Sequence, residues 1–149
     1  MLIIEPAAPT EPPVAALLAA SHALMRDLFP PEDNHFLSLD ALMAPHIHFY
    51  AARDGATVLG TGALAAMAGY GEVKSMFVAP EARGRGVARA LLRQIEDQAR
   101  ALHLPLLRLE TGDTLTAAHR LYRSFGFHDR GPFGDYSANQ TNVFMEKKL

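Results

Sequence analysis

Apolar residues recur every three or four positions in several stretches of the chain, which is the spacing of a helix with one buried face. The clearest stretch carries Val87, Leu91 and Ile95 on one stripe, with charged side chains facing away. A shorter helix of one or two turns is predicted over 38–44, with Ser38 as its N-cap. The three longer helices predicted in this way span residues 12–28, 84–103 and 116–125.

Apolar runs bounded by turn residues predict the strands. The sharpest turn signal is Asp54-Gly55, which joins the two arms of a hairpin over 46–67. A helix joins the run at 71–80 to the run at 105–111, so these two strands are predicted to be parallel in an otherwise antiparallel sheet. The remaining predicted strands are residues 2–5 and 141–149. The fold class is therefore α/β with a mixed sheet, in one domain spanning residues 1–149.

Composition narrows the function. Hydrophobic residues make up 49% of the 149 positions and charged residues 20%, which is typical of a globular domain. A net charge of −2 argues against a general binder of nucleic acid or membrane surfaces. The chain has no cysteine, which excludes disulfides and thiolate chemistry, and its N-terminus lacks the pattern of a secretion signal. We therefore expect a cytoplasmic protein.

Residues 83–86, Arg-Gly-Arg-Gly, stand where the longest amphipathic helix should have its cap. The first amides of a helix lack intrahelical partners, and this stretch offers no side-chain acceptor for them. The helix dipole, the glycines and the arginines together favour a bound phosphate. The alternative interpretation is a solvated surface loop. Neither a Walker A motif nor a dinucleotide-binding pattern fits the residues around it.

Two segments in this half of the chain resemble motifs of the GNAT acyltransferases. "VAPEARGRGVARALL" is similar to the family signature (Gln/Arg)-x-x-Gly-x-(Gly/Ala), and "AAHRLYRSFGF" is similar to its A-x-x-L-Y-x-x-x-G-F segment. The resemblance covers roughly residues 70–149. The matching positions are Arg83, Gly86 and Ala88 in the first motif and Ala118, Leu121, Tyr122, Gly126 and Phe127 in the second.

The resemblance implies the GNAT fold, in which two parallel strands splay apart and acetyl-CoA binds between them as cosubstrate. The pyrophosphate would lie on the loop amides, and the pantetheine arm would pair with the first splayed strand. Many relatives have an asparagine where this chain has Leu115, which puts one pantetheine contact in doubt. The implied cofactor-binding residues are Met76, Phe77, Val78, Arg83, Gly84, Arg85, Gly86, Val87 and Ala88.

Acetyl transfer to an amine needs a base for the ammonium proton and an acid for the leaving thiolate. Some branches of the family place a general-base glutamate eleven residues before the arginine of the signature, which here is Glu72. On a regular strand Glu72 would share a face with Lys74 and Met76. The alternative is an exposed strand-edge glutamate paired with Lys74. Tyr122 is the candidate acid, and the alternative for it is a core tyrosine.

The predicted activity is direct transfer of an acetyl group from acetyl-CoA to a primary amine, with no metal. The acceptor pocket is expected at the first predicted helix with its loop, Pro31–Phe36, and at the late loop Phe133–Tyr136. The substrate is expected to be a small-molecule or peptide amine. Two alternatives remain: a non-catalytic acyl-CoA-binding sensor, and a nucleotide-binding α/β domain. No nucleic-acid or membrane partner is expected, and a homodimer is left open.

Overall fold

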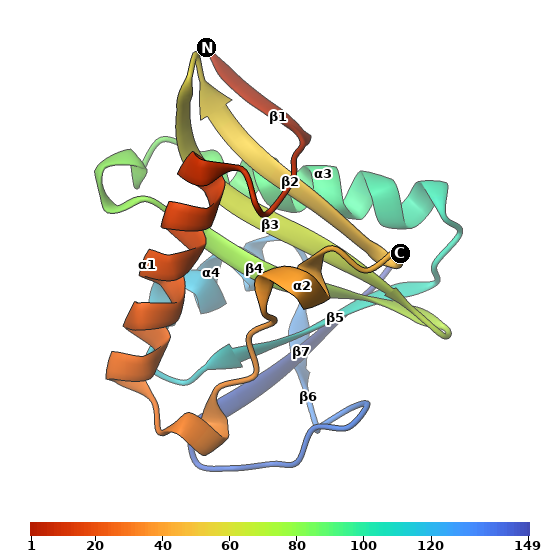
Figure 1. The fold of residues 1–149 in the computed structure, drawn as a ribbon. Helices are drawn as coiled ribbons and strands as arrows, with labels where there is room; N and C mark the ends of the chain where they lie inside the picture. Colours follow the sequence, from red (N-terminus) through yellow and green to blue (C-terminus); the bar gives the residue numbers. More distant parts are fainter.

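A seven-stranded sheet forms the centre of the computed structural model, which describes all of residues 1–149 (Figure 1). The spatial order of the strands is β1-β2-β3-β4-β5-β7-β6, and only β4 and β5 run parallel. This confirms the predicted mixed sheet and its one parallel pair. The strands are β1 (Leu2–Pro6), β2 (Ile47–Asp54), β3 (Thr57–Met67), β4 (Tyr70–Val78), β5 (Leu106–Gly112), β6 (His128–Arg130) and β7 (Asn142–Lys148).

Helices cover both faces of this sheet, and each face has its own hydrophobic core. The larger core joins the sheet to the apolar stripes of α3 and α4, and the smaller core joins it to α1 and α2. Ser38 caps α2 as predicted, since its Oγ accepts from the amide of Ala41 at 3.1 Å. The helices are α1 (Pro12–Leu28), α2 (Leu39–Leu42), α3 (Val87–Ala101) and α4 (Thr116–Ser124), with 3-10 turns η1 (Pro31–Asp33) and η2 (Pro80–Ala82).

Strand β4 contains a bulge that its residue pattern does not reveal. Thr61 pairs with Phe77 and Ala63 with Lys74, so two residues of β4 lie opposite the single residue between them on β3. Ser75 in the bulge has a φ of 55°. The extra residue turns Met76 toward α3, where its sulfur lies beside Gly62. The prediction that Glu72, Lys74 and Met76 share one face is therefore wrong for Met76.

The parallel strands β4 and β5 stay together over a short distance only. Their register contains two pairs, Gly71 with Leu107 and Glu72 with Arg108. Beyond Glu72 the edge of β4 that faces β5 has no strand partner, so its backbone donors and acceptors are available to something else. In Figure 1 the two strands separate toward the end of the sheet where α4 and the lower end of α1 lie.

Most boundaries agree with the predicted ones to within three residues, and two differences have a clear physical cause. Helix α3 begins at Val87 rather than at residue 84, because Gly84 and Gly86 adopt left-handed φ angles of 79° and 78° and keep the turn out of the helix. The short edge strand β6 lies in a stretch that has no strand pattern of its own, and it forms by pairing with β7.

Gly60 lies where side chains of α3 pack against β3, and we predict that Gly60→Ala destabilises the fold. An added Cβ would lie 2.9 Å from the carbonyl oxygen of Phe77 and 2.9 Å from Cγ1 of Val87. Overpacking of this kind costs about 1–3 kcal/mol. Gly131→Ala is the control, since nothing lies within 4 Å of its added Cβ. Urea unfolding should show a lower midpoint for Gly60→Ala alone, and equal midpoints would contradict the prediction.

Candidate active site

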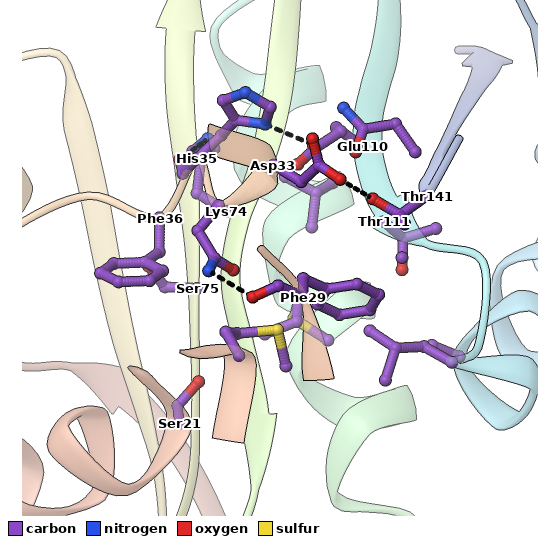
Figure 2. A pocket seen from close by; sticks show the side chains of 18 of the residues that line it. Ser21, Phe29, Asp33, His35, Phe36, Lys74, Ser75, Glu110, Thr111 and Thr141 are labelled. Carbon is purple, nitrogen blue, oxygen red and sulfur yellow. Dashed lines mark hydrogen bonds and ion pairs between the residues drawn. The ribbon is translucent and has the colours of Figure 1, made fainter. Parts of the chain in front are cut away.

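A cavity of about 150 Å³ opens between the splayed ends of β4 and β5. It is lined from one face of the sheet by α1 and the segment after it, and from the other face by α4 (Figure 2). The cavity therefore reaches both faces of the sheet at the point where the two parallel strands part. Its polar lining residues are Ser21, Asp33, Asn34, His35, Lys74, Ser75, Glu110, Thr111, Tyr122, Thr141 and Asn142.

The Arg-Gly-Arg-Gly turn stands at the N-terminus of α3, and no side chain caps it. Gly86 is the N-cap residue, and the amides of Val87, Ala88 and Arg89 have no acceptor within the protein. Arg85 forms an exposed ion pair with Asp54 at 3.3 Å, and Arg83 has no partner. The predicted arrangement of uncapped amides beside free positive charge is therefore present in the structure.

Tyr122 projects from α4 and lines the cavity. Only 6% of the residue is exposed, and its ring stands edge-on to that of Phe127 at 5.7 Å. Burial raises the pKa of Tyr122 to about 12, because the phenolate would lose its hydration. The hydroxyl has no hydrogen-bond partner within the protein, so a protonated donor faces the cavity region without an acceptor.

Glu72 lies in the middle of the sheet and is 6% exposed, so it is not an exposed edge residue. The hydroxyl of Tyr136 donates to its Oε2 at 2.5 Å, and Nζ of Lys74 lies 3.3 Å from the same oxygen. The pairing with Lys74 is thus present, but in a buried setting. Glu72 is not among the residues that line the cavity.

A carboxylate that the sequence does not single out as a base does line the cavity. Glu110, near the end of β5, bonds through Oε2 to Nδ1 of His35 at 2.6 Å (Figure 2). Asp33 lies nearby and accepts from the hydroxyl of Thr141 at 2.6 Å. His35 and Asp33 belong to the segment predicted to form the acceptor pocket, but Glu110 is 75 positions from His35, and no local pattern predicts that they meet.

One of the histidines, His119, makes a structural contact within the fold. Nε2 of His119 bonds to the carbonyl of Gly112 at 2.7 Å and ties α4 to the end of β5, so His119 does not contact Tyr122 through this nitrogen. No group of three His, Cys, Asp or Glu side chains is placed to hold a metal ion. None of the helices has the length and apolar content needed to cross a bilayer.

The cavity between splayed parallel strands and the uncapped amides at the N-terminus of α3 are the two features that a carrier with a phosphate group and an extended arm would need. The acetyltransferase (GNAT) family model matches residues 16–127. The chain belongs to this family and is an acyltransferase that uses acetyl-CoA, which confirms the resemblance and the predicted class of enzyme.

Similar proteins extend over the whole chain. An IAA acetyltransferase from Azospirillum brasilense is 48% identical over 143 residues, which cover 95% of this chain and 94% of that protein. A crystal structure from Klebsiella pneumoniae subsp. pneumoniae has a TM-score of 0.84 and 32% sequence identity, and its protein is assigned to the acyl-CoA N-acyltransferases. The match covers 100% of this chain and 98% of that chain. The structure of the PaiA N-acetyltransferase from Thermoplasma acidophilum in complex with coenzyme A has a TM-score of 0.76 and is 15% identical. The match covers 100% of this chain and 99% of that chain. The last likeness shows the fold alone.

The raised pKa of Tyr122 predicts a specific loss of stability in alkali. Because the folded-state pKa lies above the ordinary value of 10, the contribution of Tyr122 is complete below pH 10 and is lost as the pH rises toward 12. Tyr122→Phe should therefore lose less stability above pH 10 than the parent chain, by up to about 1.4 kcal/mol per pH unit. Urea unfolding between pH 9 and pH 11.5 measures this, and parallel curves would refute it.

Proposed function

We propose that this enzyme transfers an acetyl group from acetyl-CoA directly to a primary amine that binds on the α1 side of the cavity. The observation that carries the proposal is the cavity itself, which joins the two faces of the sheet between β4 and β5. Tyr122 reaches it from α4, while Glu110 and His35 reach it from the opposite side. Two substrates can therefore meet end to end between a proton donor and a proton acceptor.

The chain offers fitting contacts along the whole length of coenzyme A. The amides at the start of α3 and the unpartnered Arg83 suit the diphosphate, which both the dipole and the positive charge would stabilise. The open edge of β4 from Met76 to Val78 suits the amide groups of the pantetheine arm, which can pair as an added strand. Leu115, on the α4 side, supplies an apolar contact there in place of an asparagine.

At the acceptor end we assign the base role to Glu110. An alkylammonium of pKa near 10.4 is only about one part in 2,500 neutral at pH 7, so it must lose a proton before it can attack. Glu110 lines the cavity and His35, hydrogen-bonded to it, is partly exposed, so the proton has a path to solvent. Glu72 has the hydroxyl of Tyr136 and the ammonium of Lys74 as partners instead.

At the sulfur end Tyr122 acts as the donor. The neutral nitrogen attacks the thioester carbonyl and the C–S bond breaks. The hydroxyl of Tyr122 gives its proton to the departing sulfur as negative charge develops there, and the second proton of the nitrogen restores the hydroxyl. Its raised pKa keeps this hydroxyl protonated throughout the neutral range.

Gly86→Val tests whether the Arg-Gly-Arg-Gly turn binds the diphosphate, and Gly69→Val is its matched control. Gly86 has a φ angle of 78° and Gly69 has one of 83°, and nothing lies within 4 Å of the Cβ atom that either substitution would add. The two variants should therefore lose similar stability, about 1–2 kcal/mol from backbone strain. Only Gly86→Val should also hinder a ligand at the helix N-terminus, and calorimetry should show coenzyme A binding at least about tenfold more weakly.

If both variants bind coenzyme A equally well, the diphosphate does not lie on this turn. In the parent chain, acetyl-CoA at 100 times its dissociation constant should raise the free energy of unfolding by about 2.7 kcal/mol.

The assignment of the base is tested by comparing Glu110→Gln with Glu72→Gln. Glu110→Gln should lower kcat by about 10²-fold or more near pH 7, since the amine keeps its proton. Activity should then recover as the pH rises, because each unit yields about tenfold more free amine below the amine pKa. Glu72→Gln should chiefly lower the melting temperature, since Lys74 loses its counter-charge.

Thiol release between pH 6.5 and pH 9.5, with acetyl-CoA saturating, measures both variants. A large loss that recovers with pH in Glu72→Gln, and not in Glu110→Gln, would return the base role to Glu72.

A further inference from the structure

Lys74 is the one lysine or arginine that lines the cavity, and its ammonium is engaged by two hydrogen bonds and one ion pair within the protein. Its Nζ donates to the hydroxyl of Tyr136 at 2.8 Å and to the carbonyl of His35 at 3.2 Å, and it lies 3.3 Å from Oε2 of Glu72. Two of its three hydrogens are used in these hydrogen bonds, and the carboxylate of Glu72 offsets its charge, so little of that charge is available to a substrate. The cavity therefore offers no free lysine or arginine to a carboxylate.

The carboxylates of the cavity are partnered less completely. Asp33 accepts from Thr141, and Glu110 is bonded to His35 (Figure 2). Each carboxylate has about four acceptor sites, so most of that capacity is unused. The charge that a substrate meets here is negative, which favours an ammonium and opposes a second carboxylate.

Asn142 adds an uncharged donor on the same face. In the register of β5 and β7, Asn142 lies opposite Gly112 and Phe144 lies opposite Glu110, which makes Asn142 the diagonal neighbour of Glu110. Asn142 lines the cavity, and its Nδ2 is buried without a hydrogen-bond partner. Leaving such a donor unsatisfied costs free energy, so an acceptor supplied by a substrate would be favoured.

We infer that the acceptor is a primary amine with an uncharged carbonyl on the neighbouring carbon, as in an α-amino amide, and not a free α-amino acid. The inference rests on the proposed function and specifies the substrate class of that site. The ammonium lies at Glu110, the carbonyl oxygen accepts from Nδ2 of Asn142, and Asp33 disfavours a carboxylate in the same place.

Ser75 is the other cavity residue with a buried polar atom that lacks a partner, its Oγ. A hydroxyl can rotate and either donate or accept, so it does not discriminate between substrates. The amide nitrogen of Asn142 only donates, so it selects for an acceptor on the substrate, which a carbonyl oxygen always provides. The charge of the cavity then decides between a neutral oxygen and an anionic one.

Three acceptors of one skeleton test the inference: alaninamide, alanine and ethylamine. Rates of thiol release are expressed per concentration of free amine, which removes the difference in the fraction of each amine that is unprotonated. Alaninamide should exceed alanine in kcat/KM by at least about tenfold, because the carboxylate is repelled. It should exceed ethylamine by about fivefold, the usual worth of one hydrogen bond.

Three variants test which residue is responsible for each of these two kcat/KM ratios. Asn142→Leu should bring the ratio of alaninamide to ethylamine close to one, and Asp33→Asn should lower the ratio of alaninamide to alanine severalfold. Gln140→Leu is the control, an exposed amide two positions from Asn142 that does not line the cavity, and it should leave both ratios as they are. The melting-temperature shift with acetyl-CoA verifies that each variant is folded and binds its cosubstrate.

These experiments distinguish a wrong substrate class from a wrong proposed function. If alanine is used as well as alaninamide, or if Asn142→Leu leaves the ratio of alaninamide to ethylamine unchanged, the substrate class is wrong and the proposed function stands. If acetyl-CoA stabilises the chain but no amine in a broad panel releases thiol, the proposed function fails, and the substrate class fails with it.

Discussion

The separation of β4 from β5 is the constraint on which the rest of the molecule depends. Parallel strands joined through a helix normally continue side by side, but here the register ends after Glu72. The bulge at Ser75 turns the next residues of β4 and leaves the edge that faces β5 unpaired. Unpaired backbone inside a protein must find partners, so the fold itself creates a place for an extended ligand with amide groups. The cavity follows from the same divergence.

Lys74 has a structural consequence beyond charge balance. It joins the carbonyl of His35, in the segment after α1, to the hydroxyl of Tyr136, in the loop before β7. Burying an ammonium is costly, and three partners including Glu72 offset that cost. The ring of Tyr136 also stands edge-on to the ring of His35, with 5.1 Å between their centroids. This packing helps to orient the imidazole that bonds to Glu110. The electrostatics of Glu72 and the geometry of Glu110 are therefore linked through one lysine.

Sequence reasoning succeeds here wherever the determining physics is local. The stripe of α3, the cap at Ser38 and the missing cap at Gly86 are each read within a few residues, and the structure contains all three. It fails where distant segments decide the outcome. The bulge at Ser75 depends on β3, and Glu110 meets His35 only through the tertiary fold. The same limit explains β6, which exists because β7 offers an edge.

The two ends of the cavity differ in polarity, and this difference matches the two chemical groups that must meet there. The α4 side presents Leu115, Ala118 and Tyr122, and desolvation on that side is what raises the pKa of Tyr122. A thioester is weakly hydrated and loses little in such a setting, whereas an ammonium would lose much. The α1 side instead carries Glu110 and Asn142, which can replace the water around a cation and a neighbouring oxygen. With the thioester on the α4 side and the amine on the α1 side, as proposed, solvation would set the direction of approach before any catalytic group acts.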